Sequence, residues 1–298
     1  MSRLRTVLAA TDLSALARHA VGRAALIAAD AGARLSLQHV VNVGALDALR
    51  HLLDPGAASL NDKLLEGARG EVQVLADEMT TRYGVQAGIH VVVGAVLPEI
   101  TGHAEALDAD LVVMGARGAG FMRELLIGLT TERVLRKTTR PLLVVKQMAH
   151  EHYRRALVPV DFSPRSLETL RLVQTVAPHA EIVLLHAFEV PFEGKLRYAG
   201  VEESELSGLR INARREATGH MNELVASASV DENRVRRLVV HGEASTQVLE
   251  QEQEQDCDLI VIGKRGQGLF EEMLLGSVTK HVLARSAADV LVADRLIG

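Results

Sequence analysis

The stretch IVIGKRGQGLFEEMLLGSVT, from Ile260 to Thr279, occurs a second time as VVMGARGAGFMRELLIGLTT, from Val112 to Thr131. Each copy begins as an apolar strand, continues through a loop with several glycines, and ends where an apolar-periodic segment predicts a helix. The two copies lie about half the chain apart. A pattern repeated at that distance predicts two copies of one domain.

The chain has 298 residues, enough for two domains that each bury a core. In each half, short apolar runs alternate with helical periodicity in the order β-α-β-α-β-α-β-α-β, which predicts a doubly wound parallel sheet of the α/β class. A composition with 48% hydrophobic and 3% aromatic residues suits helices packed on such a sheet. We expect one domain over residues 1–146, a linker over 147–154 and a second domain over 155–298.

Several segments outside the repeated stretch carry structural expectations. The fifth apolar runs, Pro141–Val145 and Val290–Ala293, are candidate edge strands, and an uncovered edge promotes aggregation. We therefore expect these two strands to pair, so that the halves form an internal pseudo-dimer. The segments Gly44–Ser59 and Val190–Ser204 are predicted to be irregular, and the charge-rich run Glu250–Asp256 to be a solvated helix face.

Charge and composition argue against several classes of partner. The net charge of −5 argues against nucleic-acid binding through bulk electrostatics. No apolar run approaches the roughly 18 residues that span a bilayer, so we expect no membrane segment. The N-terminus runs directly into a strand without a signal-peptide core, which predicts a cytoplasmic setting. The single cysteine, Cys257, allows no intrachain disulfide, and its place before an apolar strand predicts a packed thiol.

The residues that could carry chemistry follow the strands in both halves. Asp12 and Asp161 end the first strand, Gly94 and Gly242 end the third, and the glycine loops follow the fourth. Ligands of open parallel sheets bind beyond the carboxyl ends of the strands, near the switch in strand order. A carboxylate there can accept from ribose hydroxyls, while loop amides and a helix start hold phosphates. This combination predicts a nucleotide site.

The glycine spacing narrows the kind of nucleotide site. The loop is not a Walker A motif, because no Gly-Lys-Ser/Thr follows at the required spacing, and it does not follow the first strand as a dinucleotide fingerprint should. Gly263, Gly266, Gly276 and Ser277 instead fit Gly-x2-Gly-x9-Gly-Ser, a restrictive pattern. With these residues, the run from Val158 to Ser163 and His186, the chain resembles the universal stress protein family in its tandem two-domain form.

The resemblance covers nearly the whole chain and implies a fold of the adenine nucleotide α-hydrolase-like type. It also implies binding of ATP or another adenine nucleotide, with or without Mg²⁺, mainly in the C-terminal domain. The residues implied to contact that nucleotide are Pro159, Val160, Asp161, Ala187, Gly242, Ile262, Gly263, Arg265, Gly266, Gly276, Ser277 and Val278. The weaker candidates in the N-terminal half are Thr11, Asp12, Val40, Gly94, Met114, Gly115, Gly118, Gly128 and Thr130.

One position distinguishes the two halves. Leu129 stands where the C-terminal half has Ser277, so the N-terminal loop lacks the hydroxyl, and the leucine side chain adds bulk. Losing one hydrogen bond to a charged group costs on the order of 1.5–3 kcal/mol, roughly a tenfold to hundredfold loss of affinity. Thr130 could replace the hydroxyl if the helix began one residue later. We expect weaker or altered nucleotide binding in the N-terminal half.

Structural alternatives exist for most of these side chains. Asp12 and Asp161 could only cap the helices that follow them. Arg117 and Arg265 could screen phosphate charge or face water. His39 and His186 on the second strands are expected to be packed histidines rather than acid–base groups. Lys264, Glu271 and Glu272 are expected to be solvated. His150 and His152 have a metal-like spacing but no supporting ligand, so no metal site is predicted.

The function expected from this resemblance is that of a cytoplasmic, ATP-binding stress-response protein. It would act through nucleotide-dependent conformation or through a protein partner that the sequence does not identify, and homodimerisation stays open. No catalytic constellation is dictated by the sequence, so we do not expect a dedicated enzyme. The alternatives are a nucleotide-free interaction module and a slow ATP-hydrolysing enzyme.

Overall fold

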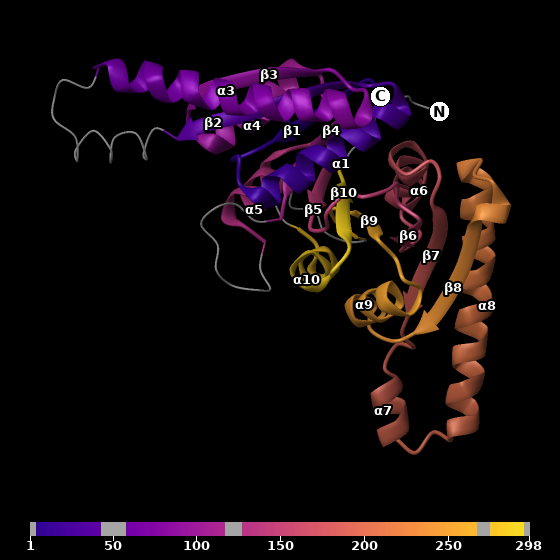
Figure 1. Ribbon diagram of the computed structural model, residues 1–298. Helices are drawn as coiled ribbons and strands as arrows, with labels where there is room; N and C mark the ends of the chain where they lie inside the picture. Colours follow the sequence, from indigo (N-terminus) through magenta and orange to yellow (C-terminus); the bar gives the residue numbers. More distant parts are fainter. Residues whose placement is uncertain (1–3, 43–57, 117–126, 267–274, 295–298) are drawn as a thin grey trace. The chain divides into compact units, whose positions relative to one another are not determined.

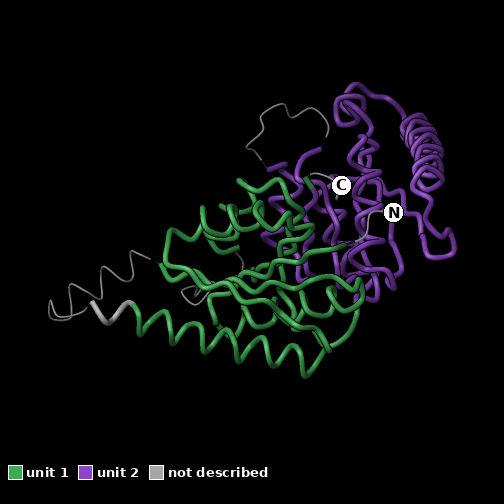
Figure 2. Tube along the Cα trace, turned by 90° about the horizontal axis from the view of Figure 1, so that it is seen from above, with its two compact units in different colours: residues 1–152, 294–298 green, residues 153–293 purple. Residues whose placement is uncertain are grey.

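A computed structural model describes residues 4–42, 58–116, 127–266 and 275–294, without the side chains of 58–61 (Figure 1). Contacts divide the chain into unit 1, residues 1–152 with 294–298, and unit 2, residues 153–293 (Figure 2). Each unit is described by itself, and the expected pairing of the fifth strands stays a prediction. Most of the segment Gly44–Ser59 lies outside the described residues, as do Arg117, Gly118, Glu271 and Glu272.

Unit 1 contains a five-stranded parallel sheet in the order β3-β2-β1-β4-β5. Its strands are β1 (Thr6–Ala10), β2 (Arg34–Asn42), β3 (Ala87–Gly94), β4 (Leu111–Gly115) and β5 (Leu142–Val145). Its helices are α1 (Ala15–Ala31), α3 (Ala58–Tyr83), α4 (Val96–Ala106) and α5 (Leu129–Lys137). The strand order reverses between β1 and β4, as in doubly wound folds.

Unit 2 repeats this arrangement, with strands in the order β8-β7-β6-β9-β10 and every pair parallel. Its strands are β6 (Arg155–Pro159), β7 (Glu181–Phe188), β8 (Val235–His241), β9 (Leu259–Gly263) and β10 (Asp289–Ala293). Its helices are α6 (Pro164–Val176), α7 (Glu193–Tyr198), α8 (Glu203–Ala228), a 3-10 turn Glu232–Arg234, α9 (Ala244–Glu254) and α10 (Ser277–Arg285). The predicted α/β class and parallel topology are confirmed.

Helices cover each sheet in two layers. In unit 1, α1 packs beside α3, and α4 packs beside α5; in unit 2 the corresponding pairs are α6 with α8 and α9 with α10. Strands β1 and β10 are buried along their whole length, which explains why they read as continuous apolar runs rather than as alternating ones. Aliphatic side chains such as Leu8, Leu111, Leu157 and Ile260 fill the cores.

An aspartate before the fourth strand of each unit holds the start of its first strand. Asp110 accepts hydrogen bonds from the backbone of Arg5, at 2.7 Å, and of Thr6, at 3.0 Å. Asp258 likewise accepts from the backbone of Arg154, at 2.9 Å, and of Arg155, at 3.1 Å. These bonds tie together the two strands on either side of the reversal in strand order. The two units therefore share this device as well as their topology.

The prediction that Val190–Ser204 is irregular is wrong. The segment contains α7, and α8 begins within it at Glu203. Charge pairs stabilise this short helix: Glu193 contacts Arg197 at 3.2 Å, four residues along, and pairs with Arg210 on α8. His241, the last residue of β8, lies 2.9 Å from the same carboxylate. The Arg210 guanidinium holds the pKa of the Glu193 carboxyl below its usual value. Contacts with residues distant in sequence thus stabilise a helix that the sequence pattern of the segment does not predict.

The expected solvated face from Glu250 to Asp256 is also wrong in part, because Gln251 and Glu252 are buried. One oxygen of Glu252 accepts three hydrogen bonds from the turn before β10. Its donors are the Ser286 hydroxyl at 3.0 Å and the backbone amides of Ala287 at 2.8 Å and Ala288 at 2.7 Å. A buried carboxylate is tolerated here because it satisfies several donors at once.

The single cysteine is packed in the interior, and the linker segment contacts α1. Cys257 is buried, as predicted, and burial raises the pKa of its thiol to about 12. In the linker, His152 pairs with Asp30 at 2.8 Å, and Arg23 on α1 donates to the carbonyl of Glu151 at 2.8 Å. No helix among the described residues is long and apolar enough to cross a membrane.

Replacing Glu252 tests the role of its buried carboxylate. Glu252→Ala leaves three donors without their acceptor, so we expect a loss of about 2–4 kcal/mol in the free energy of unfolding, measured by urea denaturation. Glu252→Gln retains an acceptor oxygen and should lose about half as much. The matched control is Glu250→Ala on the exposed side of α9, with an expected change within about 0.5 kcal/mol. Equal losses in all three variants would contradict this account.

We expect the stability of unit 1 to depend on pH through a pair of stacked histidines. The rings of His90 on β3 and His103 on α4 lie 4.0 Å apart and 12° from parallel. Burial, and secondarily the charge of His90, lowers the pKa of His103 from 6.5. A lowered folded-state pKa means that the unfolded chain takes up the proton first as pH falls. The stability contributed by neutral His103 is therefore complete above pH 6.5 and is lost as pH falls from there toward the lowered pKa.

We expect the His103→Phe variant, which keeps an aromatic ring in the stack, to lose less stability than the wild type between pH 8 and pH 5.5. The measurement is the urea midpoint of both proteins at each pH. If the variant and the wild type lose the same stability between the two pH values, His103 does not carry this dependence.

Candidate functional site

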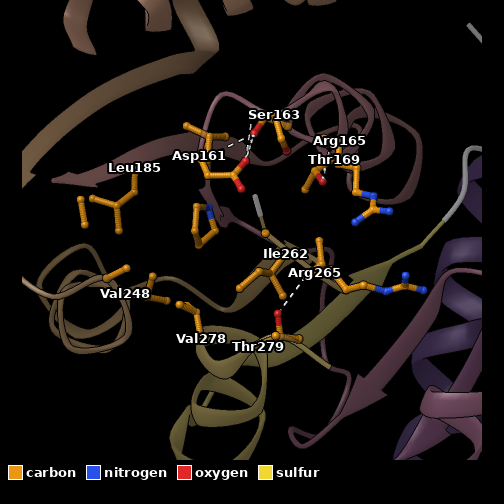
Figure 3. Close-up of a pocket in the computed structure, with 18 of the residues that line it drawn as sticks. Asp161, Ser163, Arg165, Thr169, Leu185, Val248, Ile262, Arg265, Val278 and Thr279 are labelled. Atoms are coloured by element: carbon orange, nitrogen blue, oxygen red, sulfur yellow. Dashed lines mark hydrogen bonds between the residues drawn. The ribbon is translucent and has the colours of Figure 1, made fainter. Parts of the chain in front are cut away.

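Unit 2 has a cavity of about 410 Å³ beyond the carboxyl ends of β6, β7 and β9, where the strand order reverses (Figure 3). Strand ends, the first turn of α6, helix α9 and the start of α10 contribute to its walls. The lining residues are Pro159, Val160, Asp161, Ser163, Arg165, Ser166, Thr169, Leu185, His186, Ala187, Ala244, Val248, Ile262, Gly263, Arg265, Gly266, Gly276, Ser277, Val278 and Thr279.

The carboxylate of Asp161 is held at the cavity wall by a tight turn. Phe162 adopts a left-handed backbone with φ of 60°, a conformation that costs energy for a non-glycine residue. This turn directs the Ser163 amide to Oδ1 of Asp161 at 3.0 Å, and the Ser166 hydroxyl reaches the same oxygen at 2.9 Å. The second oxygen faces Gly266, where an added Cβ would lie 3.2 Å from it. The turn and Ser166 thus fix the orientation of the Asp161 carboxylate at the cavity wall.

The glycine loop is closed at its base by hydrogen bonds. The Lys264 amide donates to the carbonyl of Ala293 at 2.7 Å, and the Gly276 amide donates to the carbonyl of Lys264 at 3.0 Å. The hydroxyl of Thr279 donates to the carbonyl of Gly263 at 2.8 Å. These bonds hold the start of α10 against the end of β9, so the described ends of the loop are fixed relative to the cavity.

Helix α10 presents its positive end to the cavity. Gly276 is its N-cap residue, with φ −59° and ψ 151°, and no side chain caps the helix. Ser277 is the first helical residue and is exposed. The first amides of a helix have no partner within the helix, and with the helix dipole they attract an anion. Together with the hydroxyl of Ser277, this helix start suits a phosphate group.

His186 on β7 forms part of the cavity wall. Its Nδ1 lies 2.9 Å from the carbonyl oxygen of Val160, and its ring contacts that of Phe162 at 4.3 Å between centroids. Because a carbonyl only accepts, Nδ1 carries the proton, and Nε2 of the neutral ring is an acceptor. His39 makes the same contact with Thr11 in unit 1, also at 2.9 Å. The interpretation of both as packed histidines agrees with these bonds, but His186 also borders the cavity.

Eleven of the twelve residues predicted for the C-terminal half line this cavity; Gly242 does not. The backbone of Gly242 has φ of 141°, which disfavours other residues, and its amide donates to the carbonyl of Phe188 at 2.9 Å. A side chain there would also crowd Gln247. Gly242 therefore allows the chain to turn from β8 into α9 and does not line the cavity.

The N-terminal half builds the same scaffold. The Gly128 amide donates to the carbonyl of Ala116 at 2.8 Å, and the hydroxyl of Thr131 donates to that of Gly115 at 2.9 Å. Leu13 has a φ of 65°, like Phe162. The other predicted residues of this half lie at matching places: Thr11 and Asp12 after β1, Val40 on β2, Gly94 at the end of β3, Met114 on β4 and Thr130 on α5.

Helix α5 begins at Leu129 as α10 begins at Ser277, so its start is not shifted, and Thr130 corresponds to Val278. The hydroxyl of Thr130 therefore does not replace that of Ser277. Leu129 is 65% exposed at the helix start. Asp12 binds its own turn, accepting from the Ser14 amide at 3.1 Å and the Ser14 hydroxyl at 2.6 Å.

The two halves differ most in the side chains around the site. When the two halves are aligned at the first strand and at the glycine loop, five pairs of equivalent positions have a polar residue in unit 2 and an apolar residue in unit 1. These pairs are Leu16 and Arg165, Ala17 and Ser166, Ala20 and Thr169, Ala116 and Lys264, and Leu129 and Ser277. Other pairs run the opposite way, with Thr11, Gln38 and Thr130 in unit 1 where unit 2 has Val160, Leu185 and Val278. The two units thus share the backbone frame but differ in which of the side chains around it are polar.

Several residues of this surround escaped the motif-based prediction, notably Arg165, Ser166 and Thr169. Their signal lies in the comparison of the halves, because each replaces an apolar residue on an otherwise similar helix. The expectation that Lys264 is solvated is wrong, since only 3% of it is exposed. Both backbone groups of Lys264 close the base of the loop, which places its side chain in the interior.

Comparisons with known proteins agree with this duplicated architecture. A model of the universal stress protein family matches residues 3–146 and 152–294. A universal stress protein of Mycolicibacterium smegmatis is 28% identical over 193 residues, 62% of this chain and 61% of that protein. One of Methanocaldococcus jannaschii is 34% identical over 88 residues, 30% of this chain and 54% of that protein. The chain thus spans about three fifths or less of the length of these relatives.

Among solved structures, a universal stress protein from Archaeoglobus fulgidus superposes with a TM-score of 0.69 over 97% of this chain and 98% of that chain, at 21% sequence identity. This likeness supports the fold of the whole chain. Because the family model covers both halves, the protein belongs to the universal stress protein family and carries two of its domains in tandem.

Proposed function

We propose that unit 2 binds ATP or another adenine nucleotide, and that the protein acts in the cytoplasmic stress response through nucleotide-dependent conformation or partner binding. The observation that carries this proposal is the convergence of three features on one cavity. These features are the carboxylate of Asp161, the glycine loop that begins at Gly263, and the uncapped start of α10 at Ser277. Each suits a different part of a nucleotide.

Different parts of the cavity lining suit the base, the ribose and the phosphates. Leu185, Val248 and Ile262 offer an apolar surface for a base, with Nε2 of His186 as a nearby acceptor. Asp161 would accept from ribose hydroxyls through the oxygen that faces Gly266. The loop amides and the start of α10 would hold the phosphates, with or without bound Mg²⁺.

We further propose binding rather than efficient turnover. Asp161 is the only acidic residue among the described residues that line the cavity. One of its oxygens accepts from Ser163 and Ser166, and the other faces Gly266, where the proposal assigns it to the ribose. Nε2 of His186 is assigned to the base, so in this arrangement neither group is placed to activate water at the terminal phosphate. The arrangement therefore favours a protein that reports the presence of a nucleotide.

Unit 1 is proposed to bind nucleotide weakly or not at all. It shares the backbone frame, but Leu129 replaces the hydroxyl of Ser277, and Leu16, Ala17 and Ala20 replace polar groups of the surround. A phosphate there would meet fewer donors at the same desolvation cost. A chain of this kind would hold one nucleotide rather than two.

Calorimetric titration of the full chain with ATP tests the proposal. We expect one binding event per chain. Ser277→Leu should lower the affinity for ATP roughly tenfold to a hundredfold, because one hydrogen bond to a charged group is removed. The matched control is Leu129→Ser in the other half. It should leave the affinity and the one-to-one stoichiometry unchanged, since Leu16, Ala17 and Ala20 still stand where unit 2 has polar side chains.

Binding of two nucleotides of equal affinity, or no effect of Ser277→Leu, would contradict the assignment to unit 2. Mass spectrometry of the purified protein for co-purifying nucleotide gives an independent test. Absence of any nucleotide binding would favour an interaction module that keeps the fold without the ligand.

A further inference from the structure

Two arginines lie on one side of the cavity in unit 2. Arg165 belongs to the first turn of α6, and Arg265 lies between Gly263 and Gly266 in the glycine loop. Both line the cavity. Figure 3 shows their guanidinium groups extending on the same side, away from Leu185 and Val248. In this view Asp161 lies between the arginines on one side and Leu185 and Val248, which form the apolar end, on the other.

The dipole of α6 does not favour a cation at the position of Arg165. A cation in the first turn of a helix meets the positive end of the helix dipole, and the first turn of α6 contains no acidic residue. No hydrogen bond or ion pair of its guanidinium occurs in the described part of the chain. The N-cap residue next to it, Ser163, has a buried hydroxyl that likewise lacks a partner among the described residues. An anion placed here would satisfy both groups.

The fold itself does not need an arginine at this position. Unit 1 has the same tight turn, the same N-cap serine at Ser14 and a helix of the same kind, with Leu16 where unit 2 has Arg165. Leu16 is 43% exposed, so this position of the helix is not part of the core. Packing therefore does not require an arginine at this position, and its side chain at the cavity wall is available to a ligand.

We propose that Arg165, together with Arg265, binds the terminal phosphates of a nucleoside triphosphate and makes this site select nucleotides by the number of their phosphates. This inference rests on the proposed function of unit 2 as a nucleotide site. With the base at the apolar end and the ribose at Asp161, the phosphate chain runs along the loop toward the arginines. A guanidinium binds phosphate oxygens with two parallel hydrogen bonds, and two arginines match the charge of a triphosphate better than that of a monophosphate.

Titration of the full chain with ATP, ADP and AMP at fixed ionic strength tests this role. The wild type should bind in the order ATP, ADP, AMP from tightest to weakest. Arg165→Leu, which introduces the residue of unit 1, should weaken ATP binding about tenfold or more and leave AMP binding within about twofold. The variant should also reduce the salt dependence of ATP affinity, because one screened charge is removed.

Two further variants separate this role from general charge effects. Arg165→Lys keeps the charge without the two-pronged geometry and should lie between the wild type and Arg165→Leu for ATP. Arg215→Leu removes an equal charge from the exposed face of α8, outside the cavity, and should change no affinity.

The outcomes separate this inference from the proposed function. Equal affinity of the wild type for ATP and AMP, or an equal loss for all three nucleotides in Arg165→Leu, overturns the inference while the nucleotide site stands. Failure of the wild type to bind any of the three overturns both.

Discussion

The structure of unit 2 depends on the closure of one loop at its base. Lys264 binds both Ala293 and Gly276 through its backbone, and Thr279 binds Gly263 through its side chain. These bonds fix the start of α10 beside the end of β9. Because the free amides of a helix start can bind an anion only where they face it, the closure matters by giving the start of α10 a fixed direction toward the cavity. The other wall of the cavity, with Asp161 and Arg165, is positioned separately by the turn at Phe162 and by α6.

The duplicated half shows that this frame and its chemistry are separable. Unit 1 keeps the loop closure through Gly128 and Thr131, and it keeps the turn at Leu13. It does not keep the polar side chains around the frame. Backbone hydrogen bonds constrain a duplicated domain strongly, because each buried amide must find a partner. Side chains that face a ligand are constrained only while a ligand is bound, so they can change in one copy without loss of the fold.

How far the sequence predicts this molecule differs between its parts. The order of strands and helices, the parallel sheets and the packed Cys257 follow from apolar periodicity, which reflects burial directly. Helix α7 and the burial of Glu252 do not follow from it. The helix is stabilised by Arg210 and His241, which come from elsewhere in the chain, and Glu252 is buried because it meets donors near Ser286. Periodicity within a segment cannot reveal a partner that the fold supplies.

The same limit applies within the site. The glycine spacing predicts where the loop and Ser277 lie, since those residues determine backbone geometry. Arg165 and the buried Lys264 are not specified by the glycine motif. Their difference from unit 1 appears only when the two halves are compared position by position. Gly242, by contrast, was predicted to contact the ligand but does not line the cavity. A glycine is favoured there because the backbone is left-handed.

The state of the only thiol has a consequence for what this protein can sense. Oxidants react with thiolates, and Cys257 is buried with a pKa of about 12, so almost none of it is ionised near neutral pH. With one cysteine in the chain, no internal partner exists to form a disulfide. The folded protein thus offers no thiol that reacts readily with mild oxidants or that could form a disulfide within the chain. Among the described residues, the sulfur that an oxidant reaches belongs to Met148, which is 50% exposed and can be oxidised to the sulfoxide.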